Sequence, residues 1–340
     1  MKAHFKKYQL QFKNSVLTSR GAMDVKNGYY LFLSEQGKTG IGECSFIEGL
    51  SKDNLLLYEQ VLILLCEALA TQSALPDLSG YPSIQFGLET ALLDLQNGGK
   101  HLIFDNAFSH GQKNIPINGL VWMGSKQFML QQVEEKLKLG YSCIKLKVGA
   151  LAFEEECRIL TFIRERFSPQ QVELRLDANG AFAASDVYQK LETLAQFHIH
   201  SIEQPVKPGE VELMAGLCKH PIIPIALDEE LITPAMGEKL NVLNAIQPQY
   251  IILKPGLLGG FDVCNRLIKH AETLGIGWWA TSALESNIGL NAIAQWVAGF
   301  QTPMVQGLGT GSLYTNNVAS PLYIKDGRLG YDEHGQWAIV

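Results

Sequence analysis

Apolar and polar residues follow one pattern up to about residue 100 and a different one after about residue 115. In the first part, short apolar runs predict strands, and two stretches with apolar residues at helical spacing predict helices. The expected strands are Phe5–Phe12, Gly28–Ser34 and Thr39–Glu43, and the helical stretches are Leu55–Leu65 and Phe86–Leu95. Residues 34–38, Ser-Glu-Gln-Gly-Lys, indicate a hairpin turn between the last two strands. The first hundred residues therefore predict an α+β unit.

From about Ile115 to residue 310, short apolar strands alternate with amphipathic helices. The expected strands are Ile115–Trp122, Cys143–Val148, Glu173–Asp177, His200–Glu203, Ile222–Asp228, Tyr250–Lys254, Gly277–Thr281 and Val305–Leu308. Helical patterns between them include Lys126–Leu139, Phe153–Phe167, Asp186–Phe197, Phe261–Leu274 and Ser286–Phe300. Strand–helix units repeated in this way over ~200 residues match a (β/α)8 barrel, and an open doubly wound sheet is the alternative.

Composition and charge exclude several classes of protein. The 340 residues include 28 Lys and Arg and 34 Asp and Glu, a net charge of −6, which argues against a nucleic-acid binder. No apolar run approaches the ~20 residues of a membrane span, and the N-terminus lacks the apolar core of a signal peptide. Six scattered cysteines without a Cys-x-x-Cys pair fit reduced thiols. We therefore expect a cytoplasmic globular protein with neither a membrane nor a nucleic acid as partner.

Ionisable side chains stand at the ends of five consecutive expected strands. These strand-end residues are Lys145, Lys147, Asp177, Glu203, Asp228 and Lys254. The carboxyl ends of barrel strands meet at one mouth, so these side chains are expected to meet there. A single strand-end carboxylate often caps a helix, but three in consecutive strands favour a shared function.

Three converging carboxylates repel one another unless a cation lies between them. All-oxygen ligands suit Mg²⁺, with Mn²⁺ as the alternative. The expected ligands are Asp177, Glu203 and a residue of the fifth strand end. Because Asp228 and Glu229 are adjacent, their spacing leaves open which of the two is the third ligand.

Lys145 and Lys147 are two residues apart on one strand and therefore point to the same face. A lysine inside a barrel is costly unless it pairs with a carboxylate or serves in the chemistry. Neighbouring positive charges favour a neutral lysine, which can act as a base. Lys254 comes from a strand across the mouth. A base, a metal ion and an opposing cation together suit the removal of a proton next to a carboxylate.

In these motifs the chain resembles the enolase superfamily, and within it the o-succinylbenzoate synthases, over nearly its whole length. Residues 145–147 resemble the family's Lys-x-Lys motif, residues 281–286 its strand-seven end, and residues 307–311 its strand-eight loop. The resemblance implies an α+β capping domain at residues 1–112, a modified TIM barrel at 113–319 and a tail, 320–340, that returns to the cap. It also favours Asp228 over Glu229 as the third ligand.

The resemblance implies a Mg²⁺-dependent syn-dehydration of 2-succinyl-6-hydroxy-2,4-cyclohexadiene-1-carboxylate to 2-succinylbenzoate, a step of menaquinone biosynthesis. Lys147 is implied as the base, and Lys254 as the cation on the opposite face. A racemase of N-acyl amino acids or a dipeptide epimerase is the alternative, although residues 307–312 lack the Asp-x-Asp motif that epimerases commonly place there. The complete set of ligands and lysines argues against a third alternative, a non-catalytic barrel.

A further set of residues is expected to contact the small carboxylate substrate. These residues are Lys145, Arg175, Asn179, Arg20, Ser282, Glu285, Gly309 and Thr310. Arg175 shares the inward direction of Asp177 and either clamps a substrate carboxylate or forms an ion pair inside the protein. Arg20 lies in a cap loop, Thr18–Met23, that closes over the mouth in this superfamily; a solvated arginine is the alternative. The sequence leaves the choice between monomer and homo-oligomer open.

Overall fold

The computed structural model describes residues 1–18 and 21–340 of the chain. Three antiparallel strands open the fold: β1 (Lys2–Thr18), β2 (Gly21–Glu35) and β3 (Lys38–Cys44), in the order β1-β2-β3. Gln36 and Gly37 connect β2 to β3, with φ angles of 51° and 77°. Two consecutive residues with positive φ form the tight turn that suits a two-residue hairpin. The hairpin predicted at this point is confirmed.

Strands β1 and β2 are longer than the apolar pattern indicates. Their pairing begins at Lys2↔Ser34, shifts register between Gln11 and Val16, and resumes at Val16↔Met23. Residues 13–15 and 24–25 are exposed, so the strands continue there without a buried face that the hydrophobic pattern could reveal. Backbone hydrogen bonds between the paired strands, rather than side-chain burial, maintain this extension.

Two helices, α1 (Tyr58–Thr71) and α2 (Pro82–Gln96), cover the antiparallel sheet. Leu62 and Leu65 of α1 and Ile84 of α2 pack against Leu31 and Leu33 of β2 in one buried cluster. Helix α2 lies very close to β3, because a Cβ on Gly42 would come within 1.9 Å of the carbonyl oxygen of Gly87. Only glycine fits this approach of helix to strand.

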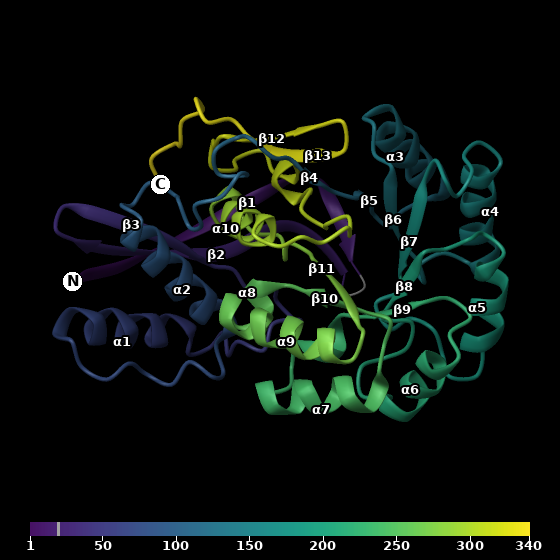
Figure 1. Ribbon diagram of the computed structural model, residues 1–340, viewed down its shortest axis with the longest axis horizontal. Coiled ribbons are helices and arrows are strands. Elements are labelled where there is room, and N and C mark those ends of the chain that lie inside the picture. Colours follow the sequence, from purple (N-terminus) through teal and green to yellow (C-terminus); the bar gives the residue numbers. More distant parts are fainter. Residues whose placement is uncertain (19–20) are drawn as a thin grey trace.

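A parallel sheet surrounded by helices forms most of the remaining molecule (Figure 1). Within the described residues the sheet has seven strands in the order β11-β10-β9-β8-β7-β6-β5. These strands are β5 (Gly119–Val121), β6 (Cys143–Lys147), β7 (Glu173–Asp177), β8 (Ser201–Glu203), β9 (Ile225–Leu227), β10 (Tyr250–Leu253) and β11 (Gly277–Ala280). Bridges from Gln306 to Ile117 and from Gly307 to Thr281 fill the eighth position and close the ring. The α/β barrel with an N-terminal α+β cap is confirmed, and the open sheet is not.

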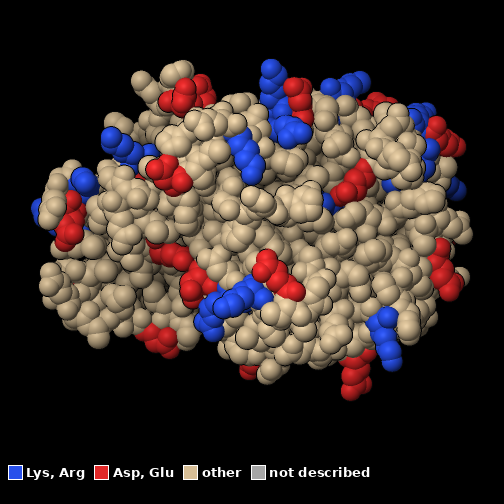
Figure 2. All heavy atoms as spheres, in the orientation of Figure 1, with Lys and Arg blue, Asp and Glu red and all other residues tan. Residues whose placement is uncertain are grey.

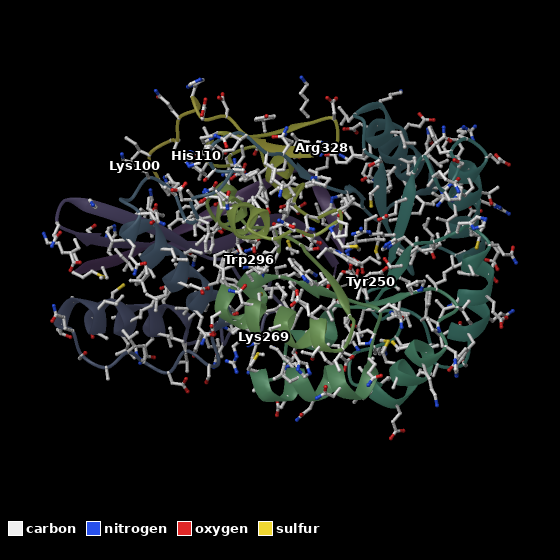
Figure 3. The ribbon with its side chains drawn as sticks, viewed as in Figure 1. Lys100, His110, Tyr250, Lys269, Trp296 and Arg328 are labelled. Atoms are coloured by element: carbon white, nitrogen blue, oxygen red, sulfur yellow. The ribbon has the colours of Figure 1, made fainter. Side chains whose placement is uncertain are left out.

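Helices alternate with these strands as the sequence pattern predicts. The long ones are α3 (Lys126–Lys138), α4 (Phe153–Arg164), α5 (Val187–Ala195), α6 (Val211–Lys219), α7 (Met236–Ile246), α9 (Phe261–Thr273) and α10 (Asn287–Ala298). Short helical turns follow three strand ends: η1 (Glu229–Leu231), α8 (Pro255–Leu258) and η2 (Thr310–Leu313). Trp296 of α10, labelled in Figure 3, lies between the helices. Its ring stacks on that of Phe261 of α9, with ring centroids 5.3 Å apart, and packs α10 against α9.

The segments on either side of the barrel depart from the expected pattern. The expected first strand, Ile115–Trp122, is divided, because β4 (Ile115–Pro116) leaves the barrel and pairs with β13 (Arg328–Tyr331). Strand β12 (Leu322–Lys325) completes this small antiparallel sheet. The tail thus forms its hydrogen bonds with β4 rather than with the cap sheet, and then reaches the cap through Trp337 and Val340, which pack beside β2.

Charged side chains of both signs are interspersed over the face shown in Figure 2. This distribution agrees with the small net charge of −6. Among the helices that the structure describes, none combines the length and the apolar character needed to cross a lipid bilayer.

Candidate active site

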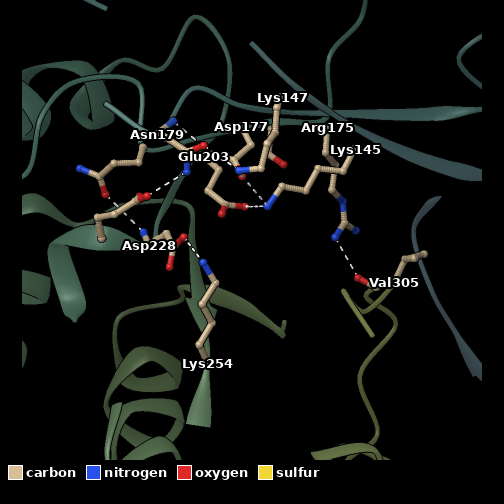
Figure 4. Close-up of polar contacts among 12 residues, drawn as sticks. Lys145, Lys147, Arg175, Asp177, Asn179, Glu203, Asp228, Lys254 and Val305 are labelled. Atoms are coloured by element: carbon tan, nitrogen blue, oxygen red, sulfur yellow. Dashed lines mark hydrogen bonds and ion pairs between the residues drawn. The ribbon is translucent and has the colours of Figure 1, made fainter. Parts of the chain in front are cut away.

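The parallel strands β6 to β10 bring the charged strand-end residues together at one mouth of the barrel (Figure 4). Lys147, the last residue of β6, pairs in register with Asp177 of β7, and Asp177 pairs with Glu203 of β8. Asp228 directly follows β9, and Lys254 directly follows β10. Their common position at the carboxyl ends of strands is the reason that residues so distant in sequence meet.

Two lysines of β6 hold the carboxylates of the neighbouring strands. Lys145 Nζ lies 2.9 Å from Asp177 Oδ2 and 2.5 Å from Glu203 Oε2. Lys147 Nζ donates to the same Asp177 oxygen at 3.0 Å and to Asn179 Oδ1 at 2.7 Å. Both lysines therefore face the interior of the barrel, as their spacing on the strand predicts.

On the side of the mouth opposite β6, another lysine is paired with a carboxylate. Lys254 Nζ forms an ion pair with Asp228 Oδ2. Three strands, β7 to β9, separate β6 from β10 in the sheet, so Lys147 and Lys254 approach the mouth from opposite sides. Glu229 faces the same space, where it accepts a hydrogen bond of 2.8 Å from Asn179 Nδ2.

Burial and neighbouring charges shift the pKa values of the three carboxyl groups in different directions. Burial raises the pKa of Asp177, but the ammonium groups of Lys145 and its neighbours outweigh this effect and hold the pKa well below its usual range. Burial and the adjacent charge of Asp177 raise the pKa of Glu203 to about 8. Burial also raises the pKa of Asp228, in spite of its ion pair with Lys254. The three carboxyl groups therefore differ in how readily they ionise, and Asp177 ionises most readily.

The carboxylate oxygens at this mouth are donors of the chemical type that a hard divalent cation prefers. Glu203 Oε1 is buried and has no hydrogen-bond partner among the described residues. A buried carboxylate oxygen without a donor, beside other carboxylates, is the kind of ligand that Mg²⁺ and Mn²⁺ prefer. Within the described ranges, however, no three Asp, Glu, His or Cys side chains are grouped so that they could hold a metal. Asp177 and Asp228 contact lysines instead, so a bound cation would compete with these ammonium groups.

A pocket of about 870 Å³ lies at this mouth, and Lys147 and Lys254 both line it. Trp122, just after β5, adds an aromatic wall, with its ring centroid 6.0 Å from Lys147 Nζ. The cap contributes apolar side chains, among them Val16 and Ile47. The pocket thus combines charged side chains with apolar walls, a composition typical of small-molecule binding sites. Trp122 was not among the expected site residues, although its place at a strand end is the same signal that identifies the lysines.

Five of the expected substrate contacts lie in the pocket wall. They are Lys145, Asn179, Ser282, Gly309 and Thr310. Their contact with a substrate stays a prediction. Arg20 lies outside the described residues.

Arg175 takes the ion-pair alternative rather than that of a substrate clamp. Its register partner is Lys145, one step deeper in the barrel than Lys147. The guanidinium is buried, donates to Glu173 Oε1 at 2.7 Å and to the carbonyl oxygen of Val305 at 2.8 Å, and lies 4.2 Å from the ring centroid of Trp279. The side chain of Arg175 points inward, as predicted, but its N–H groups point away from the mouth. They connect β7 to Val305, which lies just before the eighth strand position.

Glu285, another expected substrate contact, is not among the described residues that line the pocket. Its side chain is fully buried. Oε2 accepts hydrogen bonds from Ser282 Oγ at 2.5 Å and from the Ala283 amide at 2.6 Å. Ser282, rather than Glu285, therefore presents this segment to the pocket. Sequence spacing places both residues after β11 but does not show which of them turns inward.

Comparison with known proteins supports one family. Residues 129–335 match the family model "Enolase C-terminal domain-like", and residues 1–95 match "MenC, N-terminal domain". An o-succinylbenzoate synthase of Desulfotalea psychrophila is 45% identical, over 97% of this chain and 99% of that protein.

Solved structures give the same result. The crystal structure of MenC from Desulfotalea psychrophila superposes with a TM-score of 0.87 at 43% identity, over 97% of this chain and 99% of that one. The o-succinylbenzoate synthase of Thermosynechococcus elongatus, solved as a complex with Mg in its active site, has a TM-score of 0.74 at 25% identity and covers 90% of this chain and 92% of its own.

Proposed function

Since the chain belongs to the o-succinylbenzoate synthase family of the enolase superfamily, we propose that it dehydrates 2-succinyl-6-hydroxy-2,4-cyclohexadiene-1-carboxylate to 2-succinylbenzoate. The reaction would be a step of menaquinone biosynthesis. The observation that carries the proposal is the pair Lys147 and Lys254, which line one pocket from opposite sides with three buried carboxylates between their strands. This arrangement supports proton removal on one face of a carboxylate-bearing carbon.

In the proposed mechanism, Lys147 in its neutral form takes the proton from the ring carbon that bears the carboxylate. The C–H electron pair moves into the carboxylate and forms an enediolate. Lys254, on the other side of the pocket, stays protonated and stabilises this negative charge; a cation beside the ring also suits its π electrons. Burial lowers the pKa of Lys254, but the charges of Asp228 and its neighbours outweigh this effect and raise it above the ordinary value.

The second step breaks the bond between ring carbon 6 and its hydroxyl group. The enediolate electrons return to the ring, and the protonated Lys147 gives its proton to the departing hydroxide on the same face, which releases water. One proton is removed and one is returned, so Lys147 ends the cycle neutral. The product is aromatic, and aromatisation provides the driving force. Because one group serves as base and acid, the elimination is syn.

Asp177, Glu203 and Asp228 would hold a Mg²⁺ ion, for which Mn²⁺ is the alternative, and Glu229 is the alternative third ligand. When bound, the ion would supply positive charge beside the substrate carboxylate and so stabilise the enediolate. Lys145, paired with Asp177 and Glu203, would keep these two carboxylates in place.

The test is incubation of the purified protein with the cyclohexadiene substrate and Mg²⁺. We expect 2-succinylbenzoate to form, its formation to stop with EDTA and to resume when Mg²⁺ is added in excess. Parallel incubation of N-acyl amino acids and dipeptides in deuterium oxide examines the alternative. Deuterium at the α-carbon without formation of 2-succinylbenzoate would replace the proposal by a racemase or epimerase.

A further inference from the structure

A buried carboxylate of the cap joins the two parts of the molecule beside the pocket. Glu43, near the end of β3, accepts hydrogen bonds from the amides of Ser286 and Gly289 at 2.8 Å each and from Ser286 Oγ at 2.5 Å. Tyr8 of β1 donates to the same carboxylate. Ser286 is the N-cap of α10, so a residue of the cap domain satisfies the first amides of a barrel helix.

Glu285, next to this joint, begins a chain of hydrogen bonds that ends in the pocket. Ser282 Oγ donates to Glu285 Oε2 at 2.5 Å, and Thr310 Oγ1 donates to Ser282 Oγ at 2.6 Å. Ala283 also donates its amide to Glu285 Oε2, at 2.6 Å. That oxygen therefore acts as an acceptor for both groups, which settles the direction of the whole chain. Both hydroxyl protons are therefore donated within this chain of hydrogen bonds, and Ser282 and Thr310 both line the pocket.

The surroundings of Glu285 leave it little freedom to move. A Cβ on Gly289 would come within 2.8 Å of Glu285 Cβ and Cγ, and one on Gly256 within 2.8 Å of Glu285 Oε1. Gly289 belongs to α10, which Glu43 anchors, and Gly256 follows Lys254 in the turn after β10. Two closely packed elements therefore hold the carboxylate, and the carboxylate in turn holds Ser282.

From this geometry we propose that Glu285 is a positioning residue of the proposed dehydration, which orients the Ser282 and Thr310 hydroxyls in the pocket wall, while Glu43 anchors the adjoining start of α10 to the cap. Glu285 acts through Ser282 and does not touch the substrate. The inference rests on the proposed function, because its effect is measured on that reaction. According to this inference, the hydroxyl oxygens of Ser282 and Thr310 accept hydrogen bonds from the substrate or from an ordered water molecule.

Two variants distinguish the role of Glu285 as a hydrogen-bond acceptor from the effect of its side-chain volume. Glu285→Met keeps the length of the side chain and removes the acceptor, whereas Glu285→Gln keeps an acceptor for Ser282. We expect Glu285→Met to raise KM about tenfold, the order of one hydrogen bond, with kcat reduced less than about threefold. Glu285→Gln is expected to stay within about threefold of the parent in both constants. Should the Met variant not fold, Glu285→Asp withdraws the acceptor from Ser282 and replaces it in the test.

A double variant tests whether Glu285 acts through Ser282. Ser282→Ala should raise KM to a similar extent, and adding Glu285→Met to Ser282→Ala should change KM by less than about twofold, because the shared contact is already lost. The matched control is Asp53, whose Oδ1 accepts from Ser83 Oγ at 2.7 Å and from the Ser83 amide at 3.2 Å inside the cap. Asp53→Leu removes an equivalent carboxylate–serine pair and should leave KM within about twofold.

The remaining outcomes would contradict the inference. An unchanged KM in Glu285→Met, additive effects in the double variant, or an equal rise of KM in Asp53→Leu would overturn it and leave the dehydratase proposal intact. If Glu285→Met lowered kcat at constant KM, Glu285 would act on the turn that follows Lys254 rather than on Ser282. This result would also overturn the inference. A parent enzyme that forms no 2-succinylbenzoate would overturn the proposed function and this inference together.

Discussion

Two clusters of buried carboxylates, one at the barrel mouth and one at the joint between cap and barrel, are held in different ways. At the mouth, Asp177 and Asp228 are paired with lysine ammonium groups on flexible side chains. At the joint, Glu43 and Glu285 are held mainly by backbone amides and by short hydroxyl groups. Both clusters are buried, so burial alone does not distinguish the proposed reactive site from a structural joint.

The two clusters differ in whether the hydrogen-bond partners of their carboxylates can be replaced. A lysine can leave its carboxylate, lose its proton or give way to a cation, because its long side chain adapts at small cost. A backbone amide at a helix N-terminus keeps its proton and its position. The mouth is therefore a place where charge can move, whereas the joint maintains the geometry of the wall beside it. Four measurements test this contrast, from the largest expected effect to the smallest.

Lys147→Ala should have the largest effect, because it removes the only proton-transfer group in the proposed mechanism. We expect kcat to fall by at least about 10³-fold, within the range for loss of a general base and acid. Binding of Mg²⁺, measured by calorimetry, should remain. Lys269→Ala, at an exposed lysine of α9 (Figure 3), is the control and should be fully active. Substantial turnover by Lys147→Ala would assign the base to another residue.

Lys254→Ala should be the second most severe change. It removes the cation opposite the base, and loss of one electrostatic partner of the transition state typically costs about 10²-fold in kcat. Lys254→Arg, which keeps the charge but changes the shape, should recover part of the loss. If arginine and alanine give the same kcat, the role of Lys254 lies in its exact geometry or in proton transfer rather than in its charge.

Glu43→Gln should lower the stability of the protein more than its activity. The amide side chain keeps an acceptor for α10 but loses the charge beside the helix N-terminus and gives Tyr8 a weaker acceptor. We expect the free energy of unfolding to fall by about 1–2 kcal/mol. Chemical denaturation followed by circular dichroism measures it, with Glu272→Gln, at an exposed position of α9, as the control. Equal stability of both variants would contradict the role assigned to the joint.

The smallest effect concerns pH. Burial raises the pKa of Glu285 to about 7, its hydrogen bond with Ser282 lowers it, and the facing charge of Glu43 raises it while that of Lys26 lowers it. A carboxyl group whose pKa is raised by folding stabilises the folded state below its unfolded pKa, and this contribution is lost as pH rises through the folded pKa. The stability of Glu285→Gln relative to the parent should therefore increase between about pH 4.5 and 7 and then level off.

Asp53→Asn offers the comparison for this titration. Burial raises the pKa of Asp53 to about 6. The stability of Asp53→Asn relative to the parent should therefore increase between about pH 4 and 6. Denaturation curves across this range measure both differences. A flat difference for Glu285→Gln would show that its carboxyl group ionises in the folded protein as it does in the unfolded chain.

Much of the fold and of the charged mouth was predictable from the sequence. The alternation of short apolar runs with amphipathic helices indicated the barrel, because strands buried on both faces must be apolar and their helices must be amphipathic. The strand-end positions of Asp177, Glu203 and Asp228 then placed them at one mouth. These are properties of local periodicity, which a sequence displays directly.

Other features depended on partners that are distant in the chain. Period-two spacing showed that Arg175 points inward, but only the packed barrel decided its depth, and with it the contacts with Glu173 and Val305. The choice between Ser282 and Glu285 as the residue that faces the pocket, the amides that Glu43 caps, and the pairing of β13 with β4 were likewise decided by tertiary structure. The physical reason is that repeat and spacing determine the direction of a side chain, whereas its partner is determined by how separate elements pack together.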